Sequence, residues 1–195
     1  MLGKSVLITG GGSGIGRGVA RHFAMQGARV TISGRREKKL AATSNEMNGE
    51  IAYVVGDVTR EDDRKSMIQN SVKYGGRLDA LISNAGNMYR SDVADLDEDE
   101  LLSIFHSNVI AGMMLVKEAY DHLKHSQGCI IFVGSVHTQR AFPNASPYAA
   151  TKGALETLTG VLAAELGKDN IRVGCVRPGG VPVSYTHLRA HETAY

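Results

Sequence analysis

Six short apolar runs, separated by longer segments with helical spacing, constrain the fold of this chain more than any other feature. The runs lie at 4–9, 28–33, 51–56, 78–83, 128–134 and 170–179, and the helical segments at 14–27, 37–47, 60–75, 97–125 and 146–168. Strands that alternate with helices form right-handed βαβ units and therefore a parallel sheet. Runs such as VLIT and IIFV are apolar at nearly every position, as in strands covered on both faces. The sequence therefore predicts an α/β protein with a doubly wound parallel sheet of six strands.

The composition argues against several classes of function. The 195 residues carry a net charge of +2, which gives no electrostatic basis for binding nucleic acid or an anionic membrane. No apolar run reaches the roughly 20 residues of a membrane span, and the first strand begins without a secretion signal. The two cysteines, Cys129 and Cys175, lack paired spacing. We therefore expect a cytoplasmic protein with buried, reduced thiols.

A glycine-rich loop joins the first strand to the first helix and indicates a nucleotide site. It reads TGGGSGIG from Thr9 to Gly16. Glycine lets the backbone approach a pyrophosphate closely, and the N-terminus of the helix supplies free N–H groups. The usual G-x-G-x-x-G spacing is absent, and the alternative is a tight turn that binds nothing. The strand–loop–helix context favours a Rossmann-like dinucleotide site.

The end of the second strand indicates which dinucleotide binds. An acid there binds the 2′-hydroxyl of NAD, whereas an arginine pairs with the 2′-phosphate of NADP. The sequence places Gly34 at this point and follows it with Arg35 and Arg36. A guanidinium makes bidentate bonds to phosphate, so we expect NADP(H) rather than NAD(H), with Arg35 the stronger candidate. The alternative is a solvated basic start to a helix.

Tyr148 and Lys152 are four residues apart and therefore lie on one face of a helix. A phenol has a pKa of about 10, and an adjacent ammonium favours its phenolate form. In the reductive direction the same phenol donates a proton to a developing alkoxide. The pair alone is a weak signal, because both residues are common on helix surfaces. Two other polar residues support it: Ser135 ends the fifth strand, and Asn108 lies on the core side of the preceding helix.

These motifs together resemble the classical short-chain dehydrogenases/reductases over residues 1 to about 181. The resemblance implies that Tyr148 is the general acid/base, that Lys152 lowers its pKa and holds the nicotinamide ribose, and that Ser135 polarises the substrate oxygen. It implies that Asn108 anchors a water in a proton relay. Asp57 would contact the adenine ring, its alternative being a turn or cap acid. The cofactor contacts that it implies are Thr9, Gly10, Ser13, Gly14, Ile15, Gly16, Arg35, Arg36, Asp57, Val58, Asn84, Ala85, Gly86, Tyr148, Lys152, Pro178 and Gly179.

The resemblance implies an NADP(H)-dependent oxidoreductase that interconverts a small-molecule carbonyl and an alcohol and assembles as a homo-tetramer or dimer. The alternatives are a nucleotide-binding protein without turnover and an inactive truncated fragment. His137, two residues after Ser135, is a candidate for contact with the substrate.

The pattern of strands and helices stops after Val181. Val183 stands where the family carries a threonine, and the segment 183–193, VSYTHLRAHET, resembles a translated sequencing adapter. We therefore expect residues 1–181 to form one dinucleotide-binding domain that lacks the family's last strand, followed by a non-native tail at 182–195. The unpaired sheet edge predicts poor solubility or weak activity. His187 and His191 have the spacing of helical metal ligands, but with Glu192 as the sole local partner they predict no metal site.

Overall fold

The computed structural model describes residues 1–47 and 50–180. Its elements in chain order are β1 (Ser5–Thr9), α1 (Gly14–Met25), β2 (Arg29–Gly34), α2 (Glu37–Asn45), β3 (Ile51–Val55), α3 (Glu61–Gly75), β4 (Ala80–Ser83), the 3₁₀ turn η1 (Val93–Asp95), α4 (Glu98–Phe105), the π-helical turn η2 (His106–Ile110), α5 (Ala111–Ser126), β5 (Cys129–Val133), the 3₁₀ turn η3 (Val136–Thr138), α6 (Ser146–Leu166), the 3₁₀ turn η4 (Gly167–Asp169) and β6 (Arg172–Val176).

The six strands form one parallel sheet in the order β3-β2-β1-β4-β5-β6. The order reverses between β1 and β4, so the chain winds outward from the centre in both directions. This confirms the predicted doubly wound, Rossmann-like sheet. In such sheets the carboxyl ends of the strands diverge at the reversal and leave room for a ligand there.

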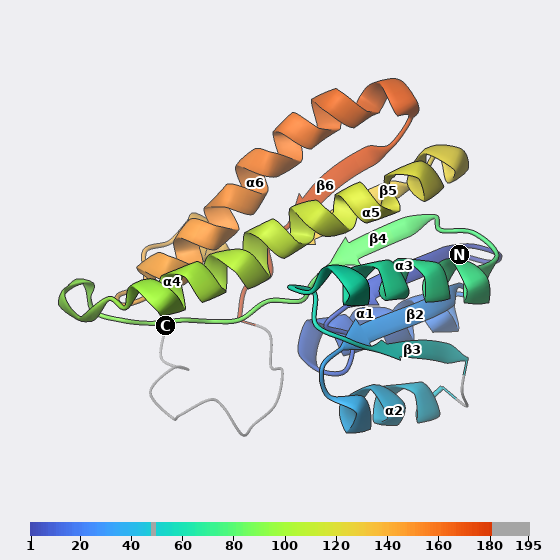
Figure 1. Ribbon diagram of the computed structural model, residues 1–195, viewed down its shortest axis with the longest axis horizontal. Coiled ribbons are helices and arrows are strands. Elements are labelled where there is room, and N and C mark those ends of the chain that lie inside the picture. Colours follow the sequence, from blue (N-terminus) through green and yellow to red (C-terminus); the bar gives the residue numbers. More distant parts are fainter. Residues whose placement is uncertain (48–49, 181–195) are drawn as a thin grey trace.

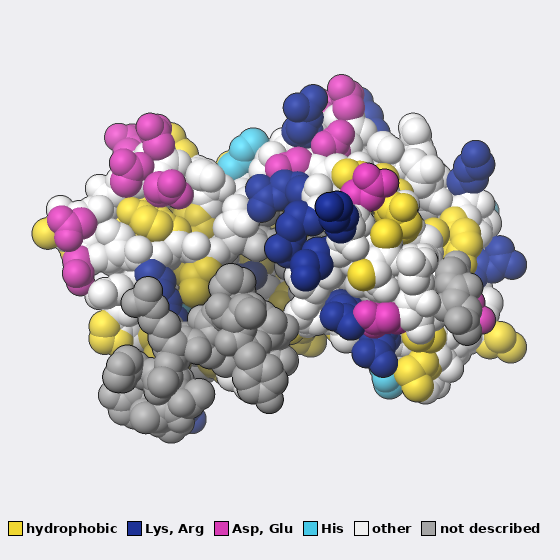
Figure 2. Space-filling view, turned by 90° about the horizontal axis from the view of Figure 1, so that it is seen from below, with side chains coloured by type: hydrophobic (Ala, Val, Ile, Leu, Met, Phe, Trp, Pro, Cys, Tyr) yellow, Lys and Arg dark blue, Asp and Glu magenta, His cyan; other side chains and the backbone are white. Residues whose placement is uncertain are grey.

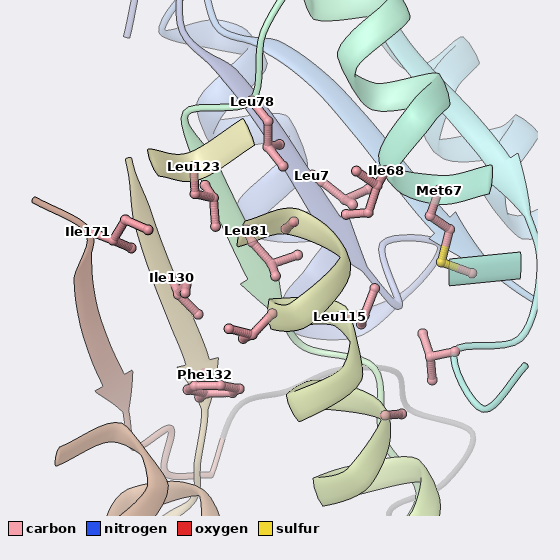
Figure 3. Close-up of a cluster of buried hydrophobic side chains, with 14 of the residues drawn as sticks. Leu7, Met67, Ile68, Leu78, Leu81, Leu115, Leu123, Ile130, Phe132 and Ile171 are labelled. Atoms are coloured by element: carbon pink, nitrogen blue, oxygen red, sulfur yellow. The ribbon is translucent and has the colours of Figure 1, made fainter. Parts of the chain in front are cut away.

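Helices cover both faces of the sheet, and each face has its own apolar core (Figure 1). On one face, Leu7, Leu81 and Phe132 of the strands pack against Leu115 of α5 and Met67 of α3 (Figure 3). These side chains are fully buried, and burial of each stabilises the fold by roughly 1.5–3 kcal/mol.

The opposite face is covered by α1 and α2. Alternate residues of the same strands, among them Ile8 and Ile32, point to this side and pack against Ala20 and Leu40. Both faces of β1 and β4 are therefore apolar, which accounts for the nearly continuous apolar runs in the sequence.

The long helix expected at 97–125 is interrupted. The structure has α4, then the π-turn η2 at His106–Ile110, then α5, and the three follow one another as a single rod beside α6 (Figure 1). A π-turn adds a residue to one helical turn and is common at functional sites. The interruption contains Asn108. The position of the Asn108 side chain therefore depends on the π-turn, which helical periodicity in the sequence does not reveal.

The last strand is shorter than the run 170–179 from which it was predicted. It ends at Val176 because Arg177 turns to pair with Glu156, with Nε–Oε1 at 2.6 Å, and Pro178 has no N–H to continue the ladder. Cys129 and Cys175 are free thiols as expected, but they are half-buried rather than buried. Burial raises the pKa of both thiols.

In the ranges 1–47 and 50–180, no helix is both long and apolar enough to cross a membrane. The segment 181–195, which includes the expected tail, His187 and His191, lies outside the described residues.

Candidate active site

The glycine loop between β1 and α1 is shaped by backbone geometry. Gly10 and Gly14 have positive φ angles of 69° and 53°, which side-chain-bearing residues rarely adopt. A Cβ on Gly16 would lie 2.5 Å from the carbonyl oxygen of Gly10. The N-cap residue Ser13 makes no capping bond with its side chain, and the first turn of α1 holds no acid. The start of α1 therefore has the features of an anion-binding helix N-terminus.

Thr9 and Asn84 fasten the loop to the end of β4. The Asn84 side-chain amide donates to the carbonyl oxygens of Thr9 at 2.8 Å and Gly10 at 3.3 Å. The hydroxyl of Thr9 accepts from the backbone N–H groups of Asn84 at 3.1 Å and Ala85 at 3.0 Å. These bonds join the central strands at their carboxyl ends. Thr9 and Asn84 thus hold the loop in shape.

A cleft of about 820 Å³ opens at this edge of the sheet. The expected cofactor residues that line it are Gly10, Ser13, Arg35, Arg36, Asp57, Val58, Asn84, Ala85 and Gly86. The other loop residues, Thr9, Gly14, Ile15 and Gly16, support this wall without lining it. The structure therefore brings nine of the seventeen expected cofactor contacts together around one cleft, which Tyr148 and Lys152 do not line.

Basic residues mark one end of the cleft. Arg36 donates to the Ser13 hydroxyl at 3.2 Å, and Arg35 donates to the Asn87 side-chain oxygen at 3.5 Å. Lys39, a residue that the sequence analysis did not single out, also lines the cleft. The sequence could have indicated Lys39, because it lies one helical turn after Arg35 and Arg36. Figure 2 shows basic side chains gathered at the middle of one face, with acidic side chains on the projecting end beside them.

Asp57 faces Arg35 at this basic end, and its carboxylate is partly used within its own turn. One oxygen accepts from the Thr59 backbone N–H at 3.0 Å and from the Thr59 hydroxyl at 2.9 Å, while the other lies 3.8 Å from the Arg35 guanidinium. Burial raises the pKa of Asp57, but the Thr59 hydrogen bonds and Arg35 outweigh burial and lower it. The turn-acid geometry, left open as an alternative, is therefore present, with Asp57 ionised in the wall of the cleft.

Ser135, Tyr148 and Lys152 converge beyond the end of β5. Ser135 lies two residues past the end of β5 and caps η3, and the other two residues lie in the first turns of α6. The side chain of Ser135 lies close enough to the Tyr148 phenol to lower its pKa, against the opposing effect of burial. The Lys152 ammonium lies 5.5 Å from the centre of the Tyr148 ring and donates to the Val133 carbonyl oxygen at 2.7 Å. A phenol, a hydroxyl and an ammonium thus face one another at the carboxyl edge of the sheet.

Asn108 reaches the site from the π-turn. Its side-chain oxygen accepts from the backbone N–H of Asn87 at 2.7 Å, and its amide nitrogen donates to the Asn87 carbonyl at 2.9 Å. The same nitrogen donates to Thr151 of α6 at 3.1 Å. A Cβ on Gly86 would come within 2.8 Å of the Asn108 oxygen. Asn108 therefore fastens the cleft wall after β4 to the helix that carries Tyr148 and Lys152.

The pKa shifts of Tyr148 and Lys152 differ from those expected from the sequence. Burial raises the pKa of Tyr148, and the side chain of Ser135 opposes that rise only in part. The expected direction was a lowering by Lys152. The reason lies in Lys152 itself, which is 5% exposed, so that burial lowers its pKa from 10.5 to about 8. A buried ammonium with a weakened hold on its proton gives less support to a phenolate.

Pro178 and Gly179 lie next to the Ser135 end of the site. The Val136 backbone N–H donates to the Pro178 carbonyl at 3.1 Å, and a Cβ on Gly179 would lie 3.8 Å from the Val136 side chain. Neither residue lines the 820 Å³ cleft. A second cavity, of about 520 Å³, lies beside the start of α6 and is lined by His137, Phe142 and Ala149 among others.

The doubly wound sheet, with its glycine loop at the reversal of strand order, defines a Rossmann-like α/β protein. The chain belongs to the short chain dehydrogenase family, whose model matches residues 4–193. This confirms the family resemblance read from the loop and from the Tyr148–Lys152 pair.

Individual relatives agree with this family assignment. L-fucose dehydrogenase of Bos taurus is 34% identical over 92% of this chain and 66% of its own length, and glucose 1-dehydrogenase of Gluconobacter oxydans is 35% identical over 92% and 70%. A 3-ketoacyl-(acyl-carrier-protein) reductase from Brucella melitensis, solved with NADH, superposes with a TM-score of 0.88 at 30% identity, over 91% of this chain and 75% of that one. The chain spans about two thirds of the length of the curated relatives.

Proposed function

We propose that this chain is an NADP(H)-dependent oxidoreductase that interconverts a carbonyl and an alcohol of a small molecule. The observation that carries the proposal is the meeting of Ser135, Tyr148 and Lys152 at the end of β5. Membership of the short chain dehydrogenase family supports the same class of reaction. The alternative is a nucleotide-binding protein without turnover.

The cleft suits a nicotinamide dinucleotide. Its volume is about 820 Å³, and its floor is a loop in which a Cβ at Gly16 would collide with the Gly10 carbonyl. The N–H groups at the start of α1 would hold the pyrophosphate, Asp57 and Val58 the adenosine end, and Lys152, Pro178 and Gly179 the nicotinamide end. When bound, the nicotinamide supplies or accepts the hydride.

The side chains of this chain would handle the proton. Ser135 would donate a hydrogen bond to the carbonyl oxygen of the substrate and polarise it. Tyr148, whose pKa is raised by burial, holds its proton at neutral pH and would donate it to the developing alkoxide. Lys152 would stabilise the resulting phenolate. The Asn108 side chain is committed to Asn87 and Thr151, so a relay water at Asn108 would bind its backbone carbonyl.

Preference for NADP(H) is supported by charge at one end of the cleft. Arg35, Arg36 and Lys39 line it there, and the position that holds an acid in NAD-specific sites is Gly34. A 2′-phosphate placed among these side chains would gain charge-assisted hydrogen bonds that a 2′-hydroxyl lacks.

Substitution of Tyr148 by Phe tests the proposed reaction. The ring and its packing remain, but the ionisable hydroxyl is lost, so kcat for carbonyl reduction should fall by about 10³-fold while the Kd for NADPH changes little. NADPH oxidation with a panel of ketones and aldoses measures the first, and NADPH fluorescence measures the second. Full activity in Tyr148→Phe would sink the proposed mechanism. NADPH binding without turnover of any substrate by the unmodified chain would favour the non-catalytic alternative.

We further propose that the protein assembles as a homo-dimer or tetramer in the cytoplasm. The rod α4–η2–α5 and the neighbouring α6 expose large apolar side chains, namely Ile110, Met113 and Val161 at 48%, 46% and 50% exposure. Apolar exposure of this kind on adjacent helices supports burial against another copy. The free thiols of Cys129 and Cys175 support a reducing compartment. Sedimentation velocity would test the assembly, which a monomer at micromolar concentration would contradict.

A further inference from the structure

His137 contacts two residues of the proposed reaction, yet the reaction as described gives it no part. Its Nδ1 lies 3.0 Å from the Ser135 hydroxyl oxygen, and its backbone N–H donates to that oxygen at 3.2 Å. Its ring stacks on Phe142 with centroids 4.3 Å apart and meets the Tyr148 ring edge-on at 5.2 Å. These contacts fix the imidazole in one orientation beside Ser135.

The hydrogen bonds of the Ser135 hydroxyl determine what this imidazole does. A hydroxyl oxygen has one hydrogen to donate and two lone pairs that accept. The His137 backbone N–H occupies one lone pair. If Nδ1 accepted from Ser135, the only hydrogen of the hydroxyl would point at the imidazole and away from Tyr148. If Nδ1 donates, both lone pairs are filled and the hydrogen points toward Tyr148 and the reacting oxygen.

The surroundings of His137 favour the second arrangement. Burial, and then the nearby Arg90, lower the pKa of His137, so the ring is neutral at neutral pH and carries one proton. Tyr148 faces the His137 ring from α6. Asp92 and Arg140 line the 520 Å³ cavity that His137 also lines. Its Nε2 is buried and has no hydrogen-bond partner within the described part of the chain. Nε2 is unpaired in either tautomer, so the two tautomers differ at the Ser135 hydroxyl. A proton on Nδ1 fills the second lone pair of that hydroxyl and leaves its hydrogen free to point away from the imidazole.

We propose that His137 is a positioning residue whose Nδ1–H donates to Ser135 and so commits the Ser135 hydroxyl to donate to the reacting oxygen. The proposal rests on the proposed function, because it refines how Ser135 meets the substrate. Filling both lone pairs of the serine also polarises its O–H bond and strengthens it as a donor.

Three substitutions separate the hydrogen bond from the packing of the ring. His137→Asn places an amide nitrogen where Nδ1 lies, His137→Gln places it nearer Nε2, and His137→Phe keeps the ring without a donor. We expect kcat to fall by about 10-fold in the Phe and Gln variants and by no more than about 3-fold in the Asn variant, with the Kd for NADPH unchanged in all three. Unchanged kcat in His137→Phe, or an Asn variant as slow as the Phe variant, would overturn the proposal.

The tautomer of His137 can be measured without turnover. Nitrogen chemical shifts of the imidazole, assigned by their absence in His137→Phe, report whether Nδ1 or Nε2 carries the proton. We expect Nδ1–H in the unmodified chain and a shift toward Nε2–H in Ser135→Ala, where the acceptor is lost. An Nε2–H tautomer in the unmodified chain contradicts the proposal. Absence of turnover together with an Nδ1–H tautomer would contradict the proposed function while leaving the His137–Ser135 bond established.

Discussion

Backbone atoms shape one half of the site, and side chains make up the other. The nucleotide end, between β1 and β3, is shaped by backbone atoms: positive φ angles at Gly10 and Gly14 and a close approach at Gly16. The chemical end, beyond β5, is made of side chains that meet from separate elements, with Lys152 held by the Val133 carbonyl and Ser135 by His137. The first half should therefore fail when space is filled, and the second when charge or a hydrogen bond is changed.

Filling space at Gly16 should give the largest effect on the affinity for the dinucleotide. In Gly16→Ala the new Cβ would lie 2.5 Å from the Gly10 carbonyl, and backbone cannot move as easily as a side chain. We expect the Kd for NADPH to rise by about 100-fold or more, measured by fluorescence titration.

The matched control for this substitution lies in the same helix. Among the described residues, no atom lies within 4 Å of the place that a Cβ would take on Gly18. Gly18→Ala should leave the Kd for NADPH unchanged and stabilise α1 by about 1 kcal/mol. Equal losses of affinity in the two variants would show that the loop is sensitive to helix propensity rather than to space.

Removing the buried charge of Lys152 tests the other half. Because burial lowers its pKa from 10.5 to about 8, the folded chain binds fewer protons than the unfolded chain between these two values. The free energy of unfolding should therefore rise as the pH rises from 8 to 10.5, whereas below pH 8 the buried charge costs its full amount, about 3 kcal/mol.

In Lys152→Met the cost of the buried charge and the rise of the free energy of unfolding with pH should both disappear, so the variant should be more stable at neutral pH. Carbonyl reduction should be lost. Urea unfolding across the alkaline range measures the first. The exposed Lys38→Met serves as a control and should change stability by about 0.5 kcal/mol or less. A destabilised Lys152→Met would show that the bond to the Val133 carbonyl outweighs the cost of burial.

A smaller effect should distinguish the two dinucleotides at the nucleotide end. Within the described ranges, a Cβ on Gly34 would meet only the Leu40 side chain, at an ordinary 3.7 Å, so an acid fits there without strain. Gly34→Asp should lower the preference for NADPH over NADH by about 10-fold, because a carboxylate repels the 2′-phosphate and accepts from the 2′-hydroxyl. The ratio of the two Kd values measures it, with the neutral Gly34→Asn as control. An unchanged ratio would place the phosphate away from Arg35 and Arg36.

The nucleotide end of the site was easier to predict from the sequence than the chemical end. Glycine spacing and strand runs report local backbone geometry, so the sheet and the loop from Thr9 to Gly16 could be predicted directly. The interruption at Asn108 could not, because α4, η2 and α5 read as one helical pattern. The contact of His137 with Tyr148 depends on how α6 packs beside η3, and the lowered pKa of Lys152 comes from a depth of burial that spacing does not encode.

The contacts of Asn108 depend on the irregular π-turn at His106–Ile110. One extra residue in a turn offsets the helical faces before and after it by about 100°, so α4 and α5 present different registers to their neighbours. A deletion of one residue within η2 would yield a more ideal helix and would carry Asn108 away from Asn87 and Thr151. Designs that improve the helix by local propensity alone would therefore weaken the link between the cleft wall and α6.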